Sequence, residues 1–332
     1  MKKNIKKLIL LLITLVFLYI VFSNLDFKEL IRTMKTFKPI YMLYLSLAMF
    51  IPFTFRSICF KYLMSNSAKI PVIELIQVCM TAAILNITLP ARAGDLFRAF
   101  FIGQKYKVDK IKVFGTVLFE RIFDTFVIFC FLMIAVSFYH RTPLTTNMCI
   151  IAAVLVFLMI VLTFIAYKFN KTDKISSFLI EKTKSYPFSE YIHKFINFIN
   201  NSLNSLFKGF EVIATPSKLP IILISAFLIW CGECLNYYLV IKGFGYDIHW
   251  SVTMFINCFI AFACMIPSTS IFIGPYQVAV ISAFALYNIP KEAALAMSFV
   301  EQAFVIILTS IVATIFLIRN NISYKELKED IQ

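Results

Sequence analysis

The chain has 332 residues, of which 60% are hydrophobic and only 15% are charged, with 32 lysines and arginines against 18 acidic residues. A soluble domain carries roughly 25% charged residues, so this composition excludes a water-soluble enzyme and indicates an integral membrane protein. The basic residues flank apolar segments, as orientation signals do, and therefore do not indicate nucleic-acid binding. We expect one polytopic membrane domain over residues 1–332.

The first apolar run, 8–22, follows four lysines that lie within the first seven residues. A basic stretch before an apolar run is also typical of a secretory signal peptide. However, no small-residue cleavage site follows Phe22, and the chain continues into polar residues. We therefore predict an uncleaved first span.

Hydropathy predicts six full spans, because these runs approach the length that crosses ~30 Å of hydrocarbon. The six runs are 8–22, 39–60, 113–139, 148–167, 219–241 and 291–318.

Two further apolar runs are interrupted. Residues 72–89 and 250–266 each end at a proline, and each is followed by a glycine-containing break and a shorter apolar stretch, 96–104 and 276–287. A proline, a glycine and a new helix start predict a broken helix or a re-entrant hairpin, which membranes tolerate only where protein or a wet cavity surrounds it. The expected fold is thus all-α integral membrane, with six full spans and two helical hairpins, or about eight membrane segments by hydropathy.

Basic residues also predict the orientation. Segments 91–112 and 168–218 are rich in lysine and arginine and are expected in the cytoplasm, together with both termini. The second of them is expected to be an amphipathic connector on the inner leaflet or a solvated one. Segment 23–38 holds four basic residues yet falls outside, which is the one assignment that disagrees. The cell membrane is the expected location.

Two parts of the chain can be aligned as an internal repeat. Placing Tyr106–Lys110 over Tyr287–Lys291 puts Glu120 on Glu301 without a gap, and the proline and glycine breaks then fall at corresponding places. Few identities support this alignment, so a chance match stays open beside a true repeat.

The predicted topology favours the repeat independently. Three full spans separate the two hairpins, and an odd number of crossings inverts the second half-unit (219–319) relative to the first (39–140). Paired broken segments in inverted halves are typical of transporters, in which the substrate site lies between the halves near the midplane.

Charged residues lie inside the predicted spans, where each central charge costs ~2.5–3.5 kcal/mol. They must pair or face water. Arg121 and Asp124 are three residues apart on a helix and can pair. Glu120 then needs a partner, which Arg92 or Arg98 could supply. The charged residues within spans are Arg56, Glu120, Arg121, Asp124, Glu233 and Glu301.

Two interpretations of the first hairpin stay open. In one, its arginines form a structural salt-bridge cluster with the neighbouring span. In the other, Arg92, Arg98 and the backbone N–H groups near Gly94 bind an anionic headgroup, since the guanidinium fork suits phosphate and a helix start carries positive charge. Gly94 would allow close backbone approach.

The second hairpin carries no charge near its break. Gln277 and Glu301 would there offer hydrogen bonds or proton coupling. Glu233, a lone carboxylate within a span, fits a proton relay and a plain interhelical hydrogen bond equally well.

The motif Leu89-Pro-Ala-Arg-Ala-Gly-Asp-Leu-Phe-Arg98, followed by Phe119-Glu-Arg-Ile-Phe-Asp124, resembles the lysylphosphatidylglycerol synthase transmembrane, or flippase-like, family. Pro267, Gly274 and Gln277 resemble its third motif, with glutamine where glutamate is common. The resemblance covers nearly the whole chain, and Arg56 resembles the family's arginine near the end of the second span. The fused members carry a soluble aminoacyl-transferase domain, which we do not expect here, because only residues 319–332 follow the last predicted span.

The resemblance implies a lipid transporter of flippase type that moves an anionic, polyprenyl-linked or modified phospholipid between leaflets. The implied partners are membrane lipids with anionic headgroups, and further copies of the chain are left open; we expect no cofactor and no metal. The expected substrate-binding residues are Arg56, Arg92, Gly94, Asp95, Arg98, Gly274 and Gln277, and the expected charge network or proton relay comprises Glu120, Arg121, Asp124, Glu233 and Glu301.

Two alternative functions stay open. An integral membrane glycosyltransferase would use a carboxylate pair for its metal, but segment 169–218 holds isolated acids and no D-x-D motif. A non-catalytic scaffold or a transporter of small solutes is the other alternative.

Overall fold

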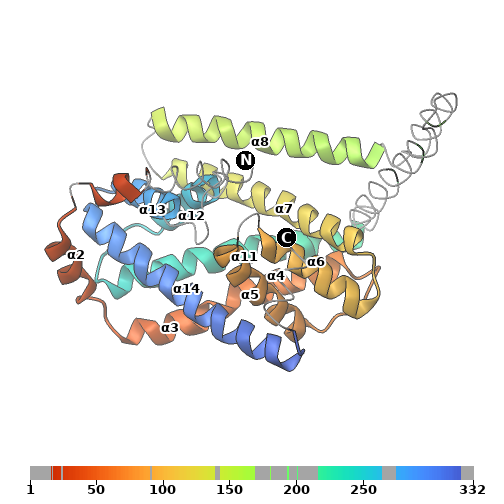
Figure 1. Cartoon of the computed structure of the whole chain (residues 1–332). Helices are drawn as coiled ribbons and strands as arrows, with labels where there is room; N and C mark the ends of the chain where they lie inside the picture. Colours follow the sequence, from red (N-terminus) through yellow and green to blue (C-terminus); the bar gives the residue numbers. More distant parts are fainter. Residues whose placement is uncertain are drawn as a thin grey trace, which may run out of the picture.

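The structure is a computed structural model that describes residues 16–138 except 17, 24, 90 and 91, then 143–168, 216–263 and 274–322, and the single positions 180, 193 and 200. All regular elements within these residues are helical (Figure 1). The expected all-α class is therefore confirmed. The predicted connector at 168–218 and most of the first span lie outside the described residues.

The long helices match the predicted spans closely. They are α7 (Lys110–Ser137), α8 (Pro143–Lys168), α11 (Leu219–Gly243), α14 (Lys291–Arg319) and the consecutive pair α3 and α4 (Ile40–Ala48 and Phe50–Leu63). Three helical stretches of the described chain are long and apolar enough to cross a membrane, namely α3–α4, α11 and α14. The chain is thus consistent with a multi-pass membrane protein, while six full spans stay a prediction.

A short helix, α2 (Phe27–Met34), occupies the segment 23–38 that the sequence predicted only as a link. Asp26 begins it, because its side chain accepts hydrogen bonds from the backbone N–H of Lys28 and Glu29 at 2.8 and 3.2 Å, as a good N-cap does. The helix is strongly amphipathic and packs against α14. The helix has only 8 residues, which is too short for its amphipathic pattern to be recognised in the sequence.

Both interrupted runs form pairs of adjacent helices. α5 (Val72–Thr88) packs beside α6 (Ala93–Tyr106), and α12 (Ser251–Ala263) packs beside α13 (Pro275–Ala285). α5 ends at Thr88 and α6 begins at Ala93, on either side of the first predicted break. The second predicted break, at Pro267, lies outside the described residues. Whether the two hairpins are re-entrant stays a prediction.

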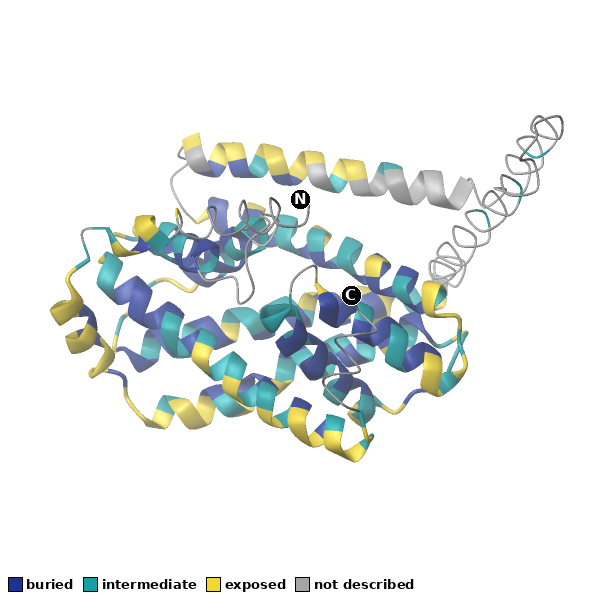
Figure 2. Ribbon diagram, viewed as in Figure 1, coloured by how far each residue is buried: buried dark blue, intermediate teal, exposed yellow. Residues whose placement is uncertain are grey.

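The first arm of each hairpin packs against the long helix of the other half, an arrangement we term exchanged packing. The second arms, α6 and α13, pack against the long helices that follow them, α7 and α14. The first arms pack crosswise, α5 against α14 and α12 against α7, while α4 and α11 contact each other between them. The buried residues concentrate where these helices meet (Figure 2).

The link from hairpin to long helix has the same backbone form in both halves. Lys107 and Asn288, which the alignment superimposes, both have positive φ, 54° and 55°. In each link the next amide donates to the carbonyl five residues earlier, at 3.0 Å after Lys107 and 3.3 Å after Asn288. This is the hydrogen bond of a Schellman helix end. The alignment therefore pairs positions of equal conformation.

Candidate functional site

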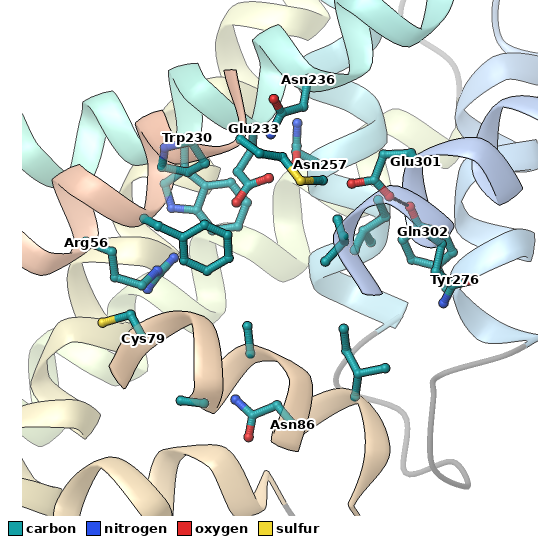
Figure 3. Close-up of a pocket in the computed structure, with 18 of the residues that line it drawn as sticks. Arg56, Cys79, Asn86, Trp230, Glu233, Asn236, Asn257, Tyr276, Glu301 and Gln302 are labelled. Carbon is teal, nitrogen blue, oxygen red and sulfur yellow. Dashed lines mark hydrogen bonds between the residues drawn. The ribbon is translucent and has the colours of Figure 1, made fainter. Parts of the chain in front are cut away.

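A cavity of about 340 Å³ lies between the two halves, and side chains from both hairpins and from α4, α7, α11 and α14 line it (Figure 3). A pocket of roughly 300–1,000 Å³ is typical of a small-molecule site. The polar lining residues are Arg56, Asn86, Asp95, Arg98, Arg121, Trp230, Glu233, Asn236, Tyr237, Asn257, Tyr276, Glu301 and Gln302.

On one side of the cavity is a set of ion pairs centred on Glu120 of α7. Arg56 Nη1 lies 2.5 Å from Glu120 Oε1, and Arg98 Nη2 lies 2.7 Å from Glu120 Oε2. Glu120 and Arg98 are each 1% exposed, and the Arg98 guanidinium stacks over the Phe60 ring at 4.4 Å. The partner that Glu120 needed is therefore Arg98, together with Arg56 from a distant part of the chain.

Asp124, one helical turn beyond Glu120, joins three helices. It accepts hydrogen bonds from Arg121 Nη1 at 2.9 Å, Arg56 Nη1 at 3.1 Å and the indole N–H of Trp230 at 3.1 Å. The predicted pairing of Arg121 with Asp124 is confirmed. Because α4, α7 and α11 each supply one of these donors, the Asp124 carboxylate links the three helices to one another.

The start of α6 is fixed by Asn86 of α5. Its side-chain oxygen accepts hydrogen bonds from the N–H of Gly94 at 2.8 Å and of Asp95 at 3.3 Å. The close approach that Gly94 allows here is to α5, since a Cβ at Gly94 would lie 1.9 Å from the Ala82 carbonyl oxygen; approach to a headgroup stays a prediction. The amides of Gly94 and Asp95, which the sequence offered for headgroup binding, already donate to Asn86.

Asp95 completes what we term the ion-pair network, which consists of Arg56, Asp95, Arg98, Glu120, Arg121 and Asp124. Its carboxylate lies 3.3 Å from Arg121 Nη2. Three arginines thus face three carboxylates, which satisfies the requirement that buried charges be paired. The arginine side chains differ in exposure, at 2% for Arg98, 16% for Arg56 and 27% for Arg121.

The opposite side of the cavity carries carboxylates and hydroxyls, which we term the carboxyl wall. Tyr276 of α13 donates its hydroxyl hydrogen bond to Glu301 Oε2 of α14, and the hydroxyls of Tyr276 and Tyr237 are hydrogen-bonded to each other. Glu233 projects from α11 between Arg56 and the Tyr276–Glu301 pair (Figure 3). The wall consists of Glu233, Asn236, Tyr237, Tyr276 and Glu301.

Gln277 and Gly274 lie behind the wall and do not line the cavity. The Gln277 side chain accepts a hydrogen bond from the Gly274 N–H at 2.8 Å and donates one to the Gln302 side chain at 2.8 Å. Gly274 has a φ of 101°, which favours glycine at the start of α13. The two residues shape the hairpin end that carries Tyr276.

Arg92 is exposed and is not among the residues that line the cavity. It has a φ of 54° directly before α6. Its expected role with lipid stays a prediction, at a position outside the ion-pair network.

Sequence reasoning overlooked several lining residues. Asn86, Trp230, Tyr237 and Tyr276 are neutral, so a search for charges within spans passed over them. A signal was present for two of them, since Tyr237 lies one helical turn after Glu233, and Tyr276 follows Gly274 within the third motif.

Comparison with known proteins gives one family and one relative. The family model described as the lysylphosphatidylglycerol synthase TM region matches residues 7–313. The chain is similar to the UPF0104 membrane protein MJ1595 of Methanocaldococcus jannaschii, at 23% identity over 328 residues, which cover 94% of each protein. No solved structure matches the chain at a significant level.

Proposed function

Because the chain belongs to the family of the lysylphosphatidylglycerol synthase transmembrane region, we propose that it is a lipid transporter of flippase type. It moves an anionic, polyprenyl-linked or modified phospholipid between leaflets. The observation that carries this proposal is the cavity of about 340 Å³, lined by arginines, inside a domain made of apolar helices. That volume suits a headgroup, with the acyl chains left in the lipid.

Arg121 and Arg56 are the side chains that bind the anionic part of the headgroup. They are more exposed than Arg98 and line the cavity. The Nε atoms of Arg121 and of Arg98 are buried and have no hydrogen-bond partner among the described residues. A buried donor without a partner calls for an explanation, and a phosphate oxygen that accepts from the guanidinium edge would provide one.

The exchanged packing of the hairpins supports transport rather than catalysis. Transporters with inverted repeats place the substrate between the repeats and alternate access by moving one against the other. Here the cavity is lined from both half-units, and each long helix contacts the first arm of the other half. A rocking motion would therefore change the cavity's opening on both sides together.

The test is lipid movement by the purified protein in vesicles of phosphatidylcholine that contain a trace of fluorescent phosphatidylglycerol. Loss of fluorescence to a reductant that cannot cross the membrane measures how fast label reaches the outer leaflet. We expect a faster exchange than in protein-free vesicles. Arg121→Gln should slow it by about 10-fold or more, since a hydrogen bond to a charged group contributes roughly 1.5–3 kcal/mol.

The matched control is Arg32→Gln, because Arg32 lies on α2 with 82% of its side chain exposed and is not among the residues that line the cavity. It should keep the wild-type rate. Protein vesicles that exchange lipid no faster than empty ones, with several anionic labels, would exclude the proposal.

A further inference from the structure

The carboxyl wall holds two carboxylates that the ion-pair network does not neutralise. Each acidic residue of the network has an arginine within 3.3 Å. Within the described residues, by contrast, Glu233 and Glu301 take part in no ion pair, although both line the same cavity. Residues 264–273, which the structure does not describe, contain no charged residue in their sequence. An unpaired carboxylate in such surroundings tends to become neutral by taking up a proton.

The elements packed around Glu301 supply hydroxyls and acids to it rather than a cation. α13 brings Tyr276 and α11 brings Tyr237 and Glu233, while the cavity-lining residues of α5 include no charged side chain. α2 and α3 also pack against α14, and in the described part of the chain neither forms an ion pair with Glu301. Glu301 is 5% exposed, so water does not screen its charge well.

The surroundings of Glu233 differ on its two sides. α4 brings Arg56 and α7 brings Asp124, and these two are already bonded to each other at 3.1 Å. On the other side lies Glu301 of α14. Lys218, in the turn before α11, is about 22 Å away along the helix axis at 1.5 Å per residue. Glu233 thus has Arg56, whose charge is already paired with Asp124, on one side and the second acid, Glu301, on the other.

A chain of hydroxyls runs from Glu301 towards Glu233 and ends at Tyr237. Tyr276 donates to Glu301 and is hydrogen-bonded to Tyr237. Tyr237 lies four residues after Glu233, so the two share a face of α11. Each hydroxyl can donate one hydrogen bond and accept others, which allows a proton to be passed along the chain in either direction. The connection runs from α14 through α13 to α11.

Asn236 provides an independent observation at this wall. Its residue is 1% exposed, it lines the cavity, and its side-chain oxygen is buried with no hydrogen-bond partner among the described residues. Buried carbonyl oxygens are normally paired. A protonated carboxyl group, or a water molecule that carries the proton, would donate the missing hydrogen bond.

We propose that the carboxyl wall is a proton-binding site, and that proton binding there is coupled to entry of the lipid's anionic headgroup beside Arg56 and Arg121; the inference rests on the proposed lipid transport. An anion that enters a cavity with two ionised carboxylates is repelled, and this repulsion ends when protons from water bind to Glu301 and Glu233. By linkage, the bound anion raises proton affinity by the same factor, and such couplings are on the order of 5- to 150-fold. Both protons return to water on the other side when the headgroup leaves.

The first experiment detects the proton without any transport. Infrared difference spectra of the detergent-purified protein, recorded as the pH is changed, should contain a protonated carboxyl band that Glu301→Gln or Glu233→Gln removes. Tyr276→Phe, which keeps the ring volume, should shift that band by removing the hydroxyl donor. Glu29→Gln is the control, because this acid on α2 is 51% exposed. A wild-type spectrum without a band that depends on Glu233 or Glu301 would overturn the inference.

The second experiment tests coupling in the phosphatidylcholine vesicles with fluorescent phosphatidylglycerol. A pH gradient should change the rate of label movement in wild type and in Glu29→Gln, and should have no effect in Glu301→Gln. If the wild-type protein moves the fluorescent lipid at a rate that does not depend on the pH gradient, or that depends on a sodium gradient instead, proton coupling is overturned and lipid transport is retained. Absence of movement in wild type would exclude the proposed function and with it the coupling, whatever the infrared spectra show about proton binding.

Discussion

The guanidinium of Arg98 meets the carboxylate of Glu120 at two points, with Nη2 2.7 Å from Oε2 and Nη1 3.5 Å from Oε1, and both side chains are almost fully buried. The two residues lie on α6 and α7, so this pair fastens the second arm of the first hairpin to the long helix. Its burial leaves Arg98 less available to a lipid than Arg56 and Arg121.

Arg98→Ala should therefore lower stability strongly. Removing one partner of a buried ion pair costs about 3–5 kcal/mol, because the other charge stays buried and unpaired. Thermal unfolding in detergent, followed by tryptophan fluorescence, measures the effect. Arg32→Ala is the comparison, since Arg32 and Glu29 form an exposed pair at 3.8 Å that contributes at most about 1 kcal/mol. Equal losses in the two variants would contradict a structural role for Arg98.

Asn86→Ala should loosen the start of α6. The variant loses the acceptor for the Gly94 and Asp95 amides, and such a loss at a helix start typically costs about 1 kcal/mol. Asn86→Asp keeps a hydrogen-bond acceptor for these amides but adds a negative charge. Its carboxylate would take the place of the Asn86 side-chain nitrogen, which now lies 3.4 Å from Asp95 Oδ1. We expect Asp to destabilise more than Ala in unfolding measurements at neutral pH. If Asp restored wild-type stability, capping alone would explain Asn86.

Gly94→Ala should separate the arms of the first hairpin. The nearest atoms to an added Cβ belong to the Ala82 backbone, beginning with its oxygen at 1.9 Å. Backbone cannot rotate away, so we expect a loss at or above the upper end of the ~1–3 kcal/mol usual for overpacking. Gly103→Ala serves as comparison, because its closest contact is the flexible Lys110 side chain, at 2.6 Å. Unfolding measurements should rank Gly94→Ala as the more damaging change.

Much of the site could be predicted because it is local in sequence. The pair of Arg121 and Asp124 follows from helix geometry, and Arg98 was one of two arginines near enough to meet Glu120. The contribution of Arg56 could not be predicted, since it reaches Glu120 across 64 residues through the packing of α4 on α7. Such contacts depend on how helices cross, which periodicity does not encode.

The neutral part of the site was harder to predict for a different reason. Tyr276 and Glu301 come from helices that the sequence placed correctly, but their hydrogen bond depends on how the start of α13 is turned. That turn depends on the φ of 101° at Gly274 and on the hydrogen bond from its N–H to Gln277. An apolar pattern locates a helix to within a few residues and does not give its rotation to that accuracy.

The two helix links with positive φ give a final test, because the same substitution should have opposite effects at different backbone conformations. Lys107 has a φ of 54°, a left-handed conformation that costs most residues roughly 1–2 kcal/mol and glycine nothing. Lys107→Gly should thus stabilise the protein by up to about 1 kcal/mol after the larger entropy of the unfolded glycine chain is subtracted. Asn288→Gly, at the equivalent link with a φ of 55°, should gain less, because asparagine adopts this conformation more readily.

Lys61→Gly is the matched control: Lys61 is an exposed residue of α4 with ordinary helical conformation, where glycine should cost about 1 kcal/mol. Unfolding temperatures that fall for Lys107→Gly as they do for Lys61→Gly would show that the first link is not held in the left-handed form, and would remove the conformational match between the two halves.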